Sequence, residues 1–250
     1  MASQNQFRFP LAAAGVFFLT TGALFGQAEF RPHSPGCAGV LFTVDGSGSL
    51  RSTSKDLAKA ICCSGLPIEV HPFEWSHGIG HVLTDLCNRS YHAKKGCELA
   101  QCVMAFREAN PHRAIGLIGH SSGAAIVLAA TEFLPPGSVD RIILLAPAVS
   151  PGYDLRPALR ASLCGIDTFY SRGDLVSRWL LLTGTADGRH RVAAGCTPFE
   201  EPDACCPDTD LYHNLRQHSY GQDGAGGHFG CTRFAFFRTR VIPLLRVDRP

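Results

Sequence analysis

The sequence predicts an α/β protein with a mostly parallel central sheet that is covered by helices on both faces. Three observations support this class. Apolar runs of strand length alternate with helical segments from residue 38 onward, and most runs are apolar throughout, as in strands buried on both faces. In addition, 45% of the residues are hydrophobic and only 18% are charged, which excludes a disordered chain. Strands that alternate with helices are joined by right-handed crossovers, which makes the sheet parallel.

Strands are predicted where a short apolar run is bounded by Gly, Pro or polar turn residues. The expected strands cover residues 38–44, 68–73, 114–119, 141–145 and 166–170, and a possible sixth covers residues 179–183. The sixth run stands apart, because residues 170–179 form a shorter connection than the roughly dozen residues that a parallel crossover needs. We therefore expect this run to be antiparallel or to form no strand.

Helices are predicted for residues 55–63, 93–110, 122–133, 155–162 and 232–245. Ser52 or Ser54 can cap the first helix, and Pro111 ends the second. The PPG sequence at residues 135–137 ends the third, which is rich in alanine and is expected to pack on the sheet. The last helix has apolar residues at helical spacing up to Pro243.

Two stretches lack a clear strand or helix pattern. Residues 75–90 are irregular in composition. Residues 184–227 are polar and rich in Gly, Pro and Cys, and we expect them to form a long loop that is pinned by disulfides. Residues 211–217 within this loop have a helical pattern.

The first 28 residues have the pattern of an export signal. Arg8 is the only charged side chain before an uncharged stretch at residues 9–28, and small residues at its end flank a plausible cleavage point. An uncleaved membrane anchor and a buried helix are the alternatives. We expect an exported protein, secreted or held in the periplasm or cell envelope, with one domain over residues 29–250. Membrane contact is expected only through the N-terminal segment, if it is not cleaved.

All eleven cysteines follow residue 28, which agrees with an oxidising compartment and with disulfides. Because the number is odd, at least one cysteine is unpaired. The doublets Cys62-Cys63 and Cys205-Cys206 lack the two-residue spacers of a zinc knuckle. The alternative ligand set is Cys206, His213 and His218. We expect structural thiols and disulfides, no metal and no other cofactor.

The sequence GHSSG at residues 119–123 is a G-x-S-x-G pentapeptide between a predicted strand and an alanine-rich predicted helix. Glycines on both sides allow a sharp, strained turn that lifts Ser121 clear of the sheet edge. The same turn aims the backbone N–H of Ser122 at a developing oxyanion. Ser121 is therefore the candidate nucleophile. The alternative is a glycine-rich turn that serves close packing only.

A serine nucleophile needs a base, and the base needs an acid that fixes its tautomer. In a parallel sheet these residues lie in turns at the carboxyl ends of strands. Asp174, after the expected strand 166–170, is the first candidate acid. Asp187, after residues 179–183, and Asp154, after residues 141–145, are the alternatives, and each of the three could instead form an Asx turn.

His228 is the first candidate base because the sequence GGHFG lets a loop carry it over the sheet edge. It also completes the chain order serine, acid, histidine. His218 is second, whereas the remaining histidines that we considered break this order: His77, His81 and His120. The second oxyanion donor is expected from Gly46 or Ser47 in the DGSG turn after the first strand.

Taken together, the GHSSG turn, the later Asp174 and the GGH loop resemble the α/β-hydrolase family of serine esterases and lipases, over about residues 37–245. The resemblance implies a triad of Ser121, Asp174 and His228 that cleaves carboxyl esters or thioesters through an acyl-enzyme. The implied partner is a small-molecule or lipid-like ester. A nucleic-acid partner is disfavoured, because the net charge is only +2 and the basic residues are scattered.

The sequence departs from the family pattern in three places. DGSG replaces the HGGG oxyanion sequence of many esterases, two leading strands have no room before Cys37, and residues 146–165 are too few for a cap domain. These departures imply a minimal hydrolase without a cap and with an open site. Residues 74–77 and the cysteine-rich loop are expected to shape its acyl pocket. A non-catalytic binding or envelope protein with this fold is the alternative.

Overall fold

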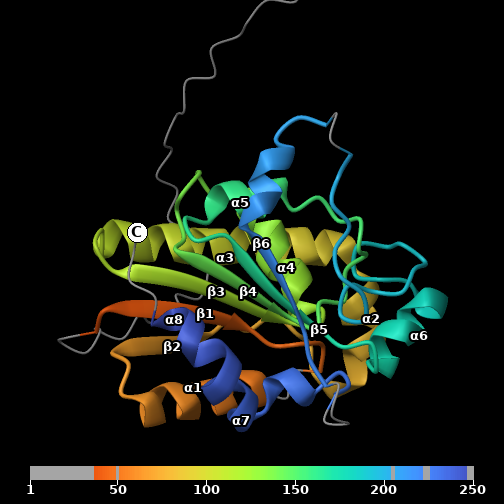
Figure 1. Ribbon diagram of the computed structural model, residues 1–250, viewed down its shortest axis with the longest axis horizontal. Helices are drawn as coiled ribbons and strands as arrows, with labels where there is room; N and C mark the ends of the chain where they lie inside the picture. Colours follow the sequence, from red (N-terminus) through yellow and green to blue (C-terminus); the bar gives the residue numbers. More distant parts are fainter. Residues whose placement is uncertain (1–36, 49–50, 204–205, 222–225, 247–250) are drawn as a thin grey trace, which may run out of the picture. The chain divides into compact units, whose positions relative to one another are not determined.

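The computed structural model describes residues 37–48, 51–203, 206–221 and 226–246 (Figure 1). The expected export signal at residues 1–28 lies outside the described residues, so that export stays a prediction. Among the helices of the described part, none has the length and apolar character needed to cross a membrane.

Six parallel strands form one sheet in the order β2-β1-β3-β4-β5-β6. They are β1 (Gly39–Val44), β2 (Ile68–Pro72), β3 (Ala114–His120), β4 (Arg141–Leu145), β5 (Ile166–Tyr170) and β6 (Leu215–Ser219). The predicted α/β class is therefore confirmed. The chain runs from β1 outward to β2 and then returns to place β3 on the other side of β1. Ligands of open α/β sheets bind at such a reversal, at the carboxyl ends of the strands.

Helices cover both faces of the sheet (Figure 1). One face carries α3 (Arg89–Ala109), α4 (Gly123–Thr131) and α5 (Arg156–Ala161). The other face carries α1 (Ser52–Ser64) and a C-terminal helical segment made of α7 (Phe234–Phe236), a π-helical turn (Phe237–Val241) and α8 (Ile242–Leu245). The wide turn lies directly before Pro243, whose ring would clash with the preceding turn of a regular α-helix.

Helix α4 fixes the turn from which it starts. All nine of its residues are buried, as expected for a helix that is apolar on every side and lies between a sheet and a second helical layer. Gly96 of α3 permits this close packing, because a Cβ atom at that position would lie 2.7 Å from the Cβ of Ala129. The start of α4, which follows Ser121 and Ser122, is thereby held rigidly against the sheet.

The structure decides one open alternative, because residues 179–183 form no strand, and it corrects one prediction. Residues 179–183 belong to a helix, α6 (Leu175–Thr183), which begins at Asp174 as its N-cap. Residues 211–217 are not helical throughout: they span the end of a 3₁₀ helix, η2 (Thr209–Asn214), and the start of β6. Strand β6 escaped prediction because it is a half-buried edge strand with the polar sequence LRQHS. The irregular stretch 75–90 also contains short helices, η1 (Ile79–His81) and α2 (Val82–Cys87).

The ten described cysteines are free thiols, so that disulfides do not pin the long loop within the described residues. Backbone hydrogen bonds hold it instead. The N–H groups of Ala186, Ala194 and Gly195 donate to the carbonyl oxygens of residues 148, 149 and 147, respectively, and each N···O distance is 2.8 Å. The loop therefore lies against the turn that follows β4.

A buried carboxylate near the start of β5 links three neighbouring strands. Asp167 is fully buried and contacts Arg141 Nη1 at 2.5 Å, Arg216 Nε at 2.9 Å and His218 Nε2 at 2.8 Å. Burial alone would raise the pKa of Asp167, but the hydrogen bonds and charges of these partners lower it below its ordinary value. The carboxylate therefore contributes to stability as an anion.

We expect Asp167→Asn to lower the free energy of unfolding by about 3 kcal/mol at neutral pH, because it leaves two arginines beside a neutral amide. Because folding lowers the pKa of Asp167, its carboxylate stabilises the folded protein at every pH above the ordinary pKa of an aspartate. This stabilisation is lost as the pH falls through the lower pKa of the folded state. Urea unfolding should therefore show a constant gap between wild type and variant at neutral pH, and a narrowing gap below pH 3.8.

The matched control is Asp154→Asn, which removes a half-exposed ion pair with Arg156. Such pairs contribute about 0–1 kcal/mol, so that this variant should unfold close to wild type. Equal losses in the two variants, or a gap for Asp167→Asn that persists at acidic pH, would contradict the role of the buried anion.

Candidate active site

Ser121 lies in a sharp turn between β3 and α4, with a left-handed backbone φ of 54°. Such a conformation costs a non-glycine residue about 1–3 kcal/mol and persists only where its surroundings hold it. Two backbone hydrogen bonds do so: Ser121 N–H donates to Leu145 O at 2.9 Å, and Ala148 N–H donates to Ser121 O at 3.0 Å. The turn after β4 thus fixes the turn after β3.

The two glycines of the pentapeptide are required by packing. A Cβ atom at Gly119 would lie 2.7 Å from the Cα of Ala124, and one at Gly123 would lie 2.2 Å from the carbonyl oxygen of Val44. Any larger residue would separate α4 from strands β1 and β3. The packing and the strained serine together match the geometry expected of a nucleophile turn.

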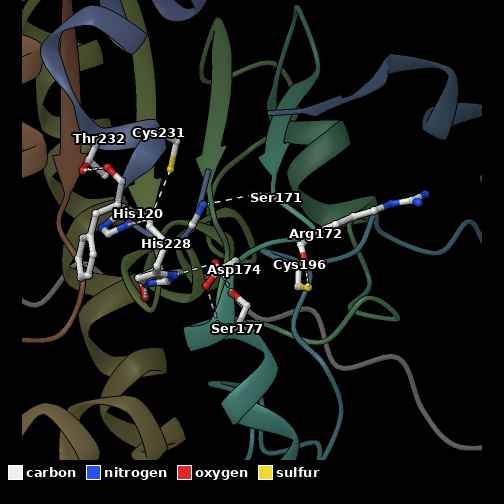
Figure 2. A network of polar contacts seen from close by, with 12 residues as sticks. His120, Ser171, Arg172, Asp174, Ser177, Cys196, His228, Cys231 and Thr232 are labelled. Atoms are coloured by element: carbon white, nitrogen blue, oxygen red, sulfur yellow. Dashed lines mark hydrogen bonds and ion pairs between the residues drawn. The ribbon is translucent and has the colours of Figure 1, made fainter. Parts of the chain in front are cut away.

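His228 lies between Ser121 and Asp174. Its Nε2 is 2.8 Å from Ser121 Oγ, and its Nδ1 is 2.8 Å from Asp174 Oδ2. Figure 2 shows the imidazole pointing at the carboxylate, with Ser177 on the far side of the acid. The structure thus brings the three predicted residues together from the turns after β3, β5 and β6.

Asp174 is fully buried and caps α6. Its Oδ1 accepts a hydrogen bond from Ser177 N–H at 2.9 Å, and its Oδ2 accepts one from Ser177 Oγ at 2.7 Å. Burial alone would raise the pKa of Asp174, but the hydrogen bond and charge of His228 and the two bonds from Ser177 lower it. The carboxylate stays ionised beside the imidazole.

The two alternative acids are engaged elsewhere. Asp187 accepts hydrogen bonds from Ser150 N–H at 2.8 Å, from Ser150 Oγ at 2.6 Å and from Thr185 Oγ1 at 2.6 Å. Asp154 pairs with Arg156 at the surface. Asp187 therefore stabilises the turn after β4, and neither carboxylate contacts His228.

The other histidines also have separate partners. His218 contacts Asp167, His77 Nδ1 lies 2.6 Å from Asp85, and His81 packs beside His77. Because His218 is held by Asp167, the alternative metal set with Cys206 and His213 is not assembled. Within the described residues, no three His, Cys, Asp or Glu side chains gather in a way that could hold a metal ion.

His120 supports the loop of His228 without contacting Ser121 Oγ. Its Nε2 lies 3.3 Å from the carbonyl oxygen of His228, and the two rings lie 5.1 Å apart (Figure 2). Because a carbonyl oxygen only accepts, Nε2 carries the proton. Burial, and then the charge of His228, lower the pKa of His120 to about 3. His120 is therefore a neutral positioning residue.

The predicted oxyanion residues gather beside Ser121. A Cβ atom at Gly46 would lie 3.1 Å from the Cβ of Ser121, so that this turn approaches the nucleophile closely. Ser47 N–H donates to Ser122 Oγ at 2.9 Å, and the hydroxyls of Ser47 and Ser122 are 2.6 Å apart. Between described residues, no hydrogen bond uses the N–H of Gly46 or Ser122.

Comparison with known proteins bears on the fold. The family model described as "Serine aminopeptidase, S33" matches residues 97–191, a stretch that contains Ser121, Asp174 and strands β3 to β5. The matched strands belong to the six-stranded parallel sheet, with the strained serine turn at its reversal point. The chain has the α/β-hydrolase fold. No curated protein sequence matches the chain.

Several solved structures are similar to this α/β-hydrolase chain at low identity. A cutinase-like protein from Cryptococcus sp. is 15% identical, with a TM-score of 0.44 over 83% of this chain and 93% of that one. The RedJ thioesterase of Streptomyces coelicolor is 14% identical, with a TM-score of 0.45 over 89% and 97%. A Trichoderma reesei cutinase is 13% identical, with a TM-score of 0.34 over 44% and 52%, so that the match spans about half of that cutinase.

A pocket beside Ser121 has apolar walls. Val82 and Leu86 of α2 form one wall, Val176 and Leu180 of α6 form another, and Phe229 lies at the edge. Contrary to expectation, residues 74–77 and the described residues of the cysteine-rich loop do not line this pocket. Residues 75–90, although irregular in composition, include α2, which presents two apolar side chains to the site.

Residues 74–77 instead hold the turn at residues 45–48, which carries the predicted oxyanion residues. Trp75 Nε1 donates to the carbonyl oxygen of Asp45 at 2.8 Å. Ser76 Oγ accepts from Gly48 N–H at 3.0 Å and donates to the buried Asp85 at 2.6 Å. Burial would raise the pKa of Asp85, but the bonds from His77 and Ser76 lower it, so that the acceptor stays charged.

Sequence reasoning missed these supporting residues for different reasons. Ser177 had a local signal, because Asp174 three residues before it forms an N-cap pattern that predicts both bonds to the carboxylate. Trp75 and Asp85 had none, since each acts on a turn that is about thirty or more residues away in the chain. Only the folded chain brings them to residues 45–48.

Proposed function

We propose that this chain is a serine hydrolase that cleaves carboxyl esters or thioesters through an acyl-enzyme. One observation carries the proposal: an unbroken path of hydrogen-bond distances from Ser121 Oγ through His228 to the ionised Asp174. An activated serine needs a base within about 2.6–3.2 Å and a third group that orients the base. The three side chains meet both requirements.

The geometry supports the following sequence of steps. His228 Nε2 takes the proton from Ser121 Oγ as the oxygen attacks the carbonyl carbon, and Asp174 stabilises the imidazolium and holds its tautomer. The N–H groups of Ser122 and Gly46 stabilise the oxyanion, since Ser47 N–H already donates to Ser122 Oγ. Each such donor typically contributes about 10²–10³ in kcat. His228 then protonates the leaving alcohol or thiol, which departs as the carbonyl forms again.

Deacylation reverses the roles. A water molecule replaces the leaving group, and His228 removes its proton as the water oxygen attacks the acyl carbon. The second tetrahedral intermediate collapses, Ser121 Oγ takes the proton back from His228, and the carboxylic acid leaves. No step uses a cofactor, since nucleophile, base and acid all come from this chain.

The pocket favours uncharged acyl groups over peptides with a free amino terminus. An aminopeptidase must bind a protonated amine, for which a free carboxylate is the natural partner. The one acidic side chain in the described pocket lining is Asp45, and its carboxylate already accepts from Thr53 N–H and from the N–H and hydroxyl of Ser54. The apolar walls suit an acyl chain better.

A fluorophosphonate probe tests the proposal. The folded protein should take up one probe per chain, and mass spectrometry should place the adduct on Ser121, because phosphonylation needs a serine that its base has activated. Urea-unfolded protein is the control and should stay unlabelled. A folded protein that remains unlabelled, or that carries the adduct on another residue, would favour a non-catalytic binding protein with the same fold.

We also propose that the protein is exported, on the basis of the sequence pattern in residues 1–28. The described residues do not bear on this part of the proposal. A small or lipid-like ester outside the cytosol would then be the substrate.

A further inference from the structure

Large apolar side chains are exposed around the mouth of the pocket. Of the twelve such side chains exposed in the described part of the chain, nine lie in η1, α2 or α6 or are Phe229. The other three lie elsewhere in the fold: Met104, Phe133 and Leu163. Scattered apolar residues are normal on a soluble protein, but a contiguous group marks an interaction surface.

The exposed group is continuous with the pocket. We use the name apolar rim for five residues outside the pocket lining: Ile79, Leu83, Leu175, Trp179 and Leu182. Each is 65–72% exposed. Val82 and Val176 connect the rim to the pocket, because they line the pocket yet remain 41% and 43% exposed. In Figure 1, α2 and α6 lie at the same end of the sheet.

The two helices of the rim carry almost no exposed charge, and Arg51 of the pocket lining is paired with Glu74. Arg178 is the one charged side chain in α6, and the one acid in α2, Asp85, is fully buried. Helix α6 buries Ser177 and Leu180 and exposes its tryptophan, its valine and three leucines instead. This arrangement is the reverse of an ordinary surface helix, whose exposed face is polar. A partner without net charge fits such a face.

We propose that the apolar rim docks on the surface of a lipid ester phase without net charge, so that an ester molecule can pass from that surface into the pocket. The inference rests on the proposed ester hydrolysis. A protein partner or a second copy of this chain seated on the rim would close the path to Ser121. An assembled lipid ester covers the rim and supplies the pocket at the same time.

Intrinsic fluorescence reports directly on this surface. The chain has two tryptophans: Trp75 is 4% exposed and Trp179 is 65% exposed. When full-length Ser121→Ala protein is titrated with phosphatidylcholine vesicles, we expect a saturable shift of the emission to shorter wavelength and weaker quenching by acrylamide. Trp75 should contribute a constant background, because it is already buried.

Two variants test the rim against a matched control. Leu83→Ser and Leu182→Ser, each in the Ser121→Ala background, should bind the vesicles about tenfold more weakly, since each removes one leucine from the contact. Leu163→Ser removes a leucine that is 57% exposed outside the rim and should bind like its parent. All variants keep the same N-terminal segment, so that differences between them report the rim alone.

Activity separates this inference from the proposed function. With Ser121 intact, Leu83→Ser and Leu182→Ser should hydrolyse dissolved p-nitrophenyl butyrate at the wild-type kcat/KM but should hydrolyse a long-chain ester in phosphatidylcholine vesicles about tenfold more slowly. If the rim variants and the control variant bound vesicles equally while the dissolved ester was turned over normally, the docking role of the rim would be overturned and the proposed function would stand. Rim-dependent vesicle binding without turnover of either ester would support the rim and overturn the proposed function.

Two further results would reassign the surface. If the protein bound vesicles of anionic phosphatidylglycerol tenfold more tightly than vesicles of phosphatidylcholine, the binding would be driven by charge. That result would overturn the assignment to an uncharged surface. Sedimentation velocity that shows a wild-type dimer, dissociated by Leu182→Ser, would make the rim an interface between copies. A monomer at all concentrations would support the lipid assignment.

Discussion

Ser121→Ala is expected to lower kcat for p-nitrophenyl butyrate by about 10⁵–10⁶-fold, close to the loss seen when any triad nucleophile is removed. The other hydroxyl of the pentapeptide, Ser122 Oγ, is not placed to replace it, because it is bonded to Ser47. Stopped-flow or long-time absorbance assays at saturating ester would measure the loss.

The fold should survive this change. Alanine keeps the Cβ atom, so that the strained φ of 54° costs no more than it does for serine, and both backbone hydrogen bonds of the turn remain. Far-UV circular dichroism and the urea midpoint should match wild type. The control is Ser122→Ala, which keeps the backbone N–H of the oxyanion site but loses the contact with Ser47.

We expect the control to lose about tenfold in kcat, because only the positioning of the Gly46-Ser47 turn is disturbed. If Ser121→Ala kept more than a few per cent of wild-type turnover while Ser122→Ala lost most of it, the nucleophile would be Ser122. The GHSSG sequence offers both hydroxyls, and the contact with His228 distinguishes them.

How far the sequence predicts the fold depends on burial. Strands β3, β4 and β5 lie inside the sheet and are largely buried, so that a plain apolar run predicts their positions to within a residue. Strand β6 pairs on one side only and keeps polar residues, which hides it from that criterion. The polar composition of β6 reflects the exposure of its side chains and gives no sign of the extended conformation of its backbone.

Helix α6 shows the opposite ambiguity, because its apolar sequence is compatible with a strand that the structure does not form. Its sequence LVSRWLLLT has the composition of a buried strand, yet three of its large apolar residues are the exposed ones of the rim. The helix is set by its start, where Asp174 caps Ser177 N–H and where the chain must leave the sheet to bring the carboxylate to His228. An apolar run that stays exposed beside the pocket misleads any rule that assigns apolar residues to the core.

The candidate site was predictable where the backbone itself needs a special residue. Glycines flank Ser121 and precede His228, and these local requirements are visible in one sequence. The choice of acid was not, because three aspartates follow successive apolar runs. The tertiary structure decides between them, because His228 contacts Asp174, whereas Asp187 accepts a hydrogen bond from Ser150.

Asp174→Asn is therefore expected to reduce kcat by about four orders of magnitude. The amide oxygen can still accept from Ser177 N–H and keep α6 capped, so that the fold remains. The amide nitrogen, however, would donate to His228 Nδ1, which places the imidazole proton on Nε2, where it faces Ser121 Oγ. An Nε2 that carries a proton cannot take another from the serine.

Asp187→Asn is the matched comparison, since it also turns a carboxylate that accepts serine and threonine hydrogen bonds, here a half-buried one, into an amide. It should change kcat by less than about threefold while lowering the free energy of unfolding by about 1 kcal/mol, because the charged acceptor that holds Ser150 in the turn after β4 becomes neutral. Both variants should be assayed at equal folded fraction, checked by urea unfolding. If Asp187→Asn had a lower kcat than Asp174→Asn, Asp187 would be the acid that acts on His228 during turnover, although His228 contacts Asp174 in this structure. The turn at Ser150 would then have to open as substrate binds.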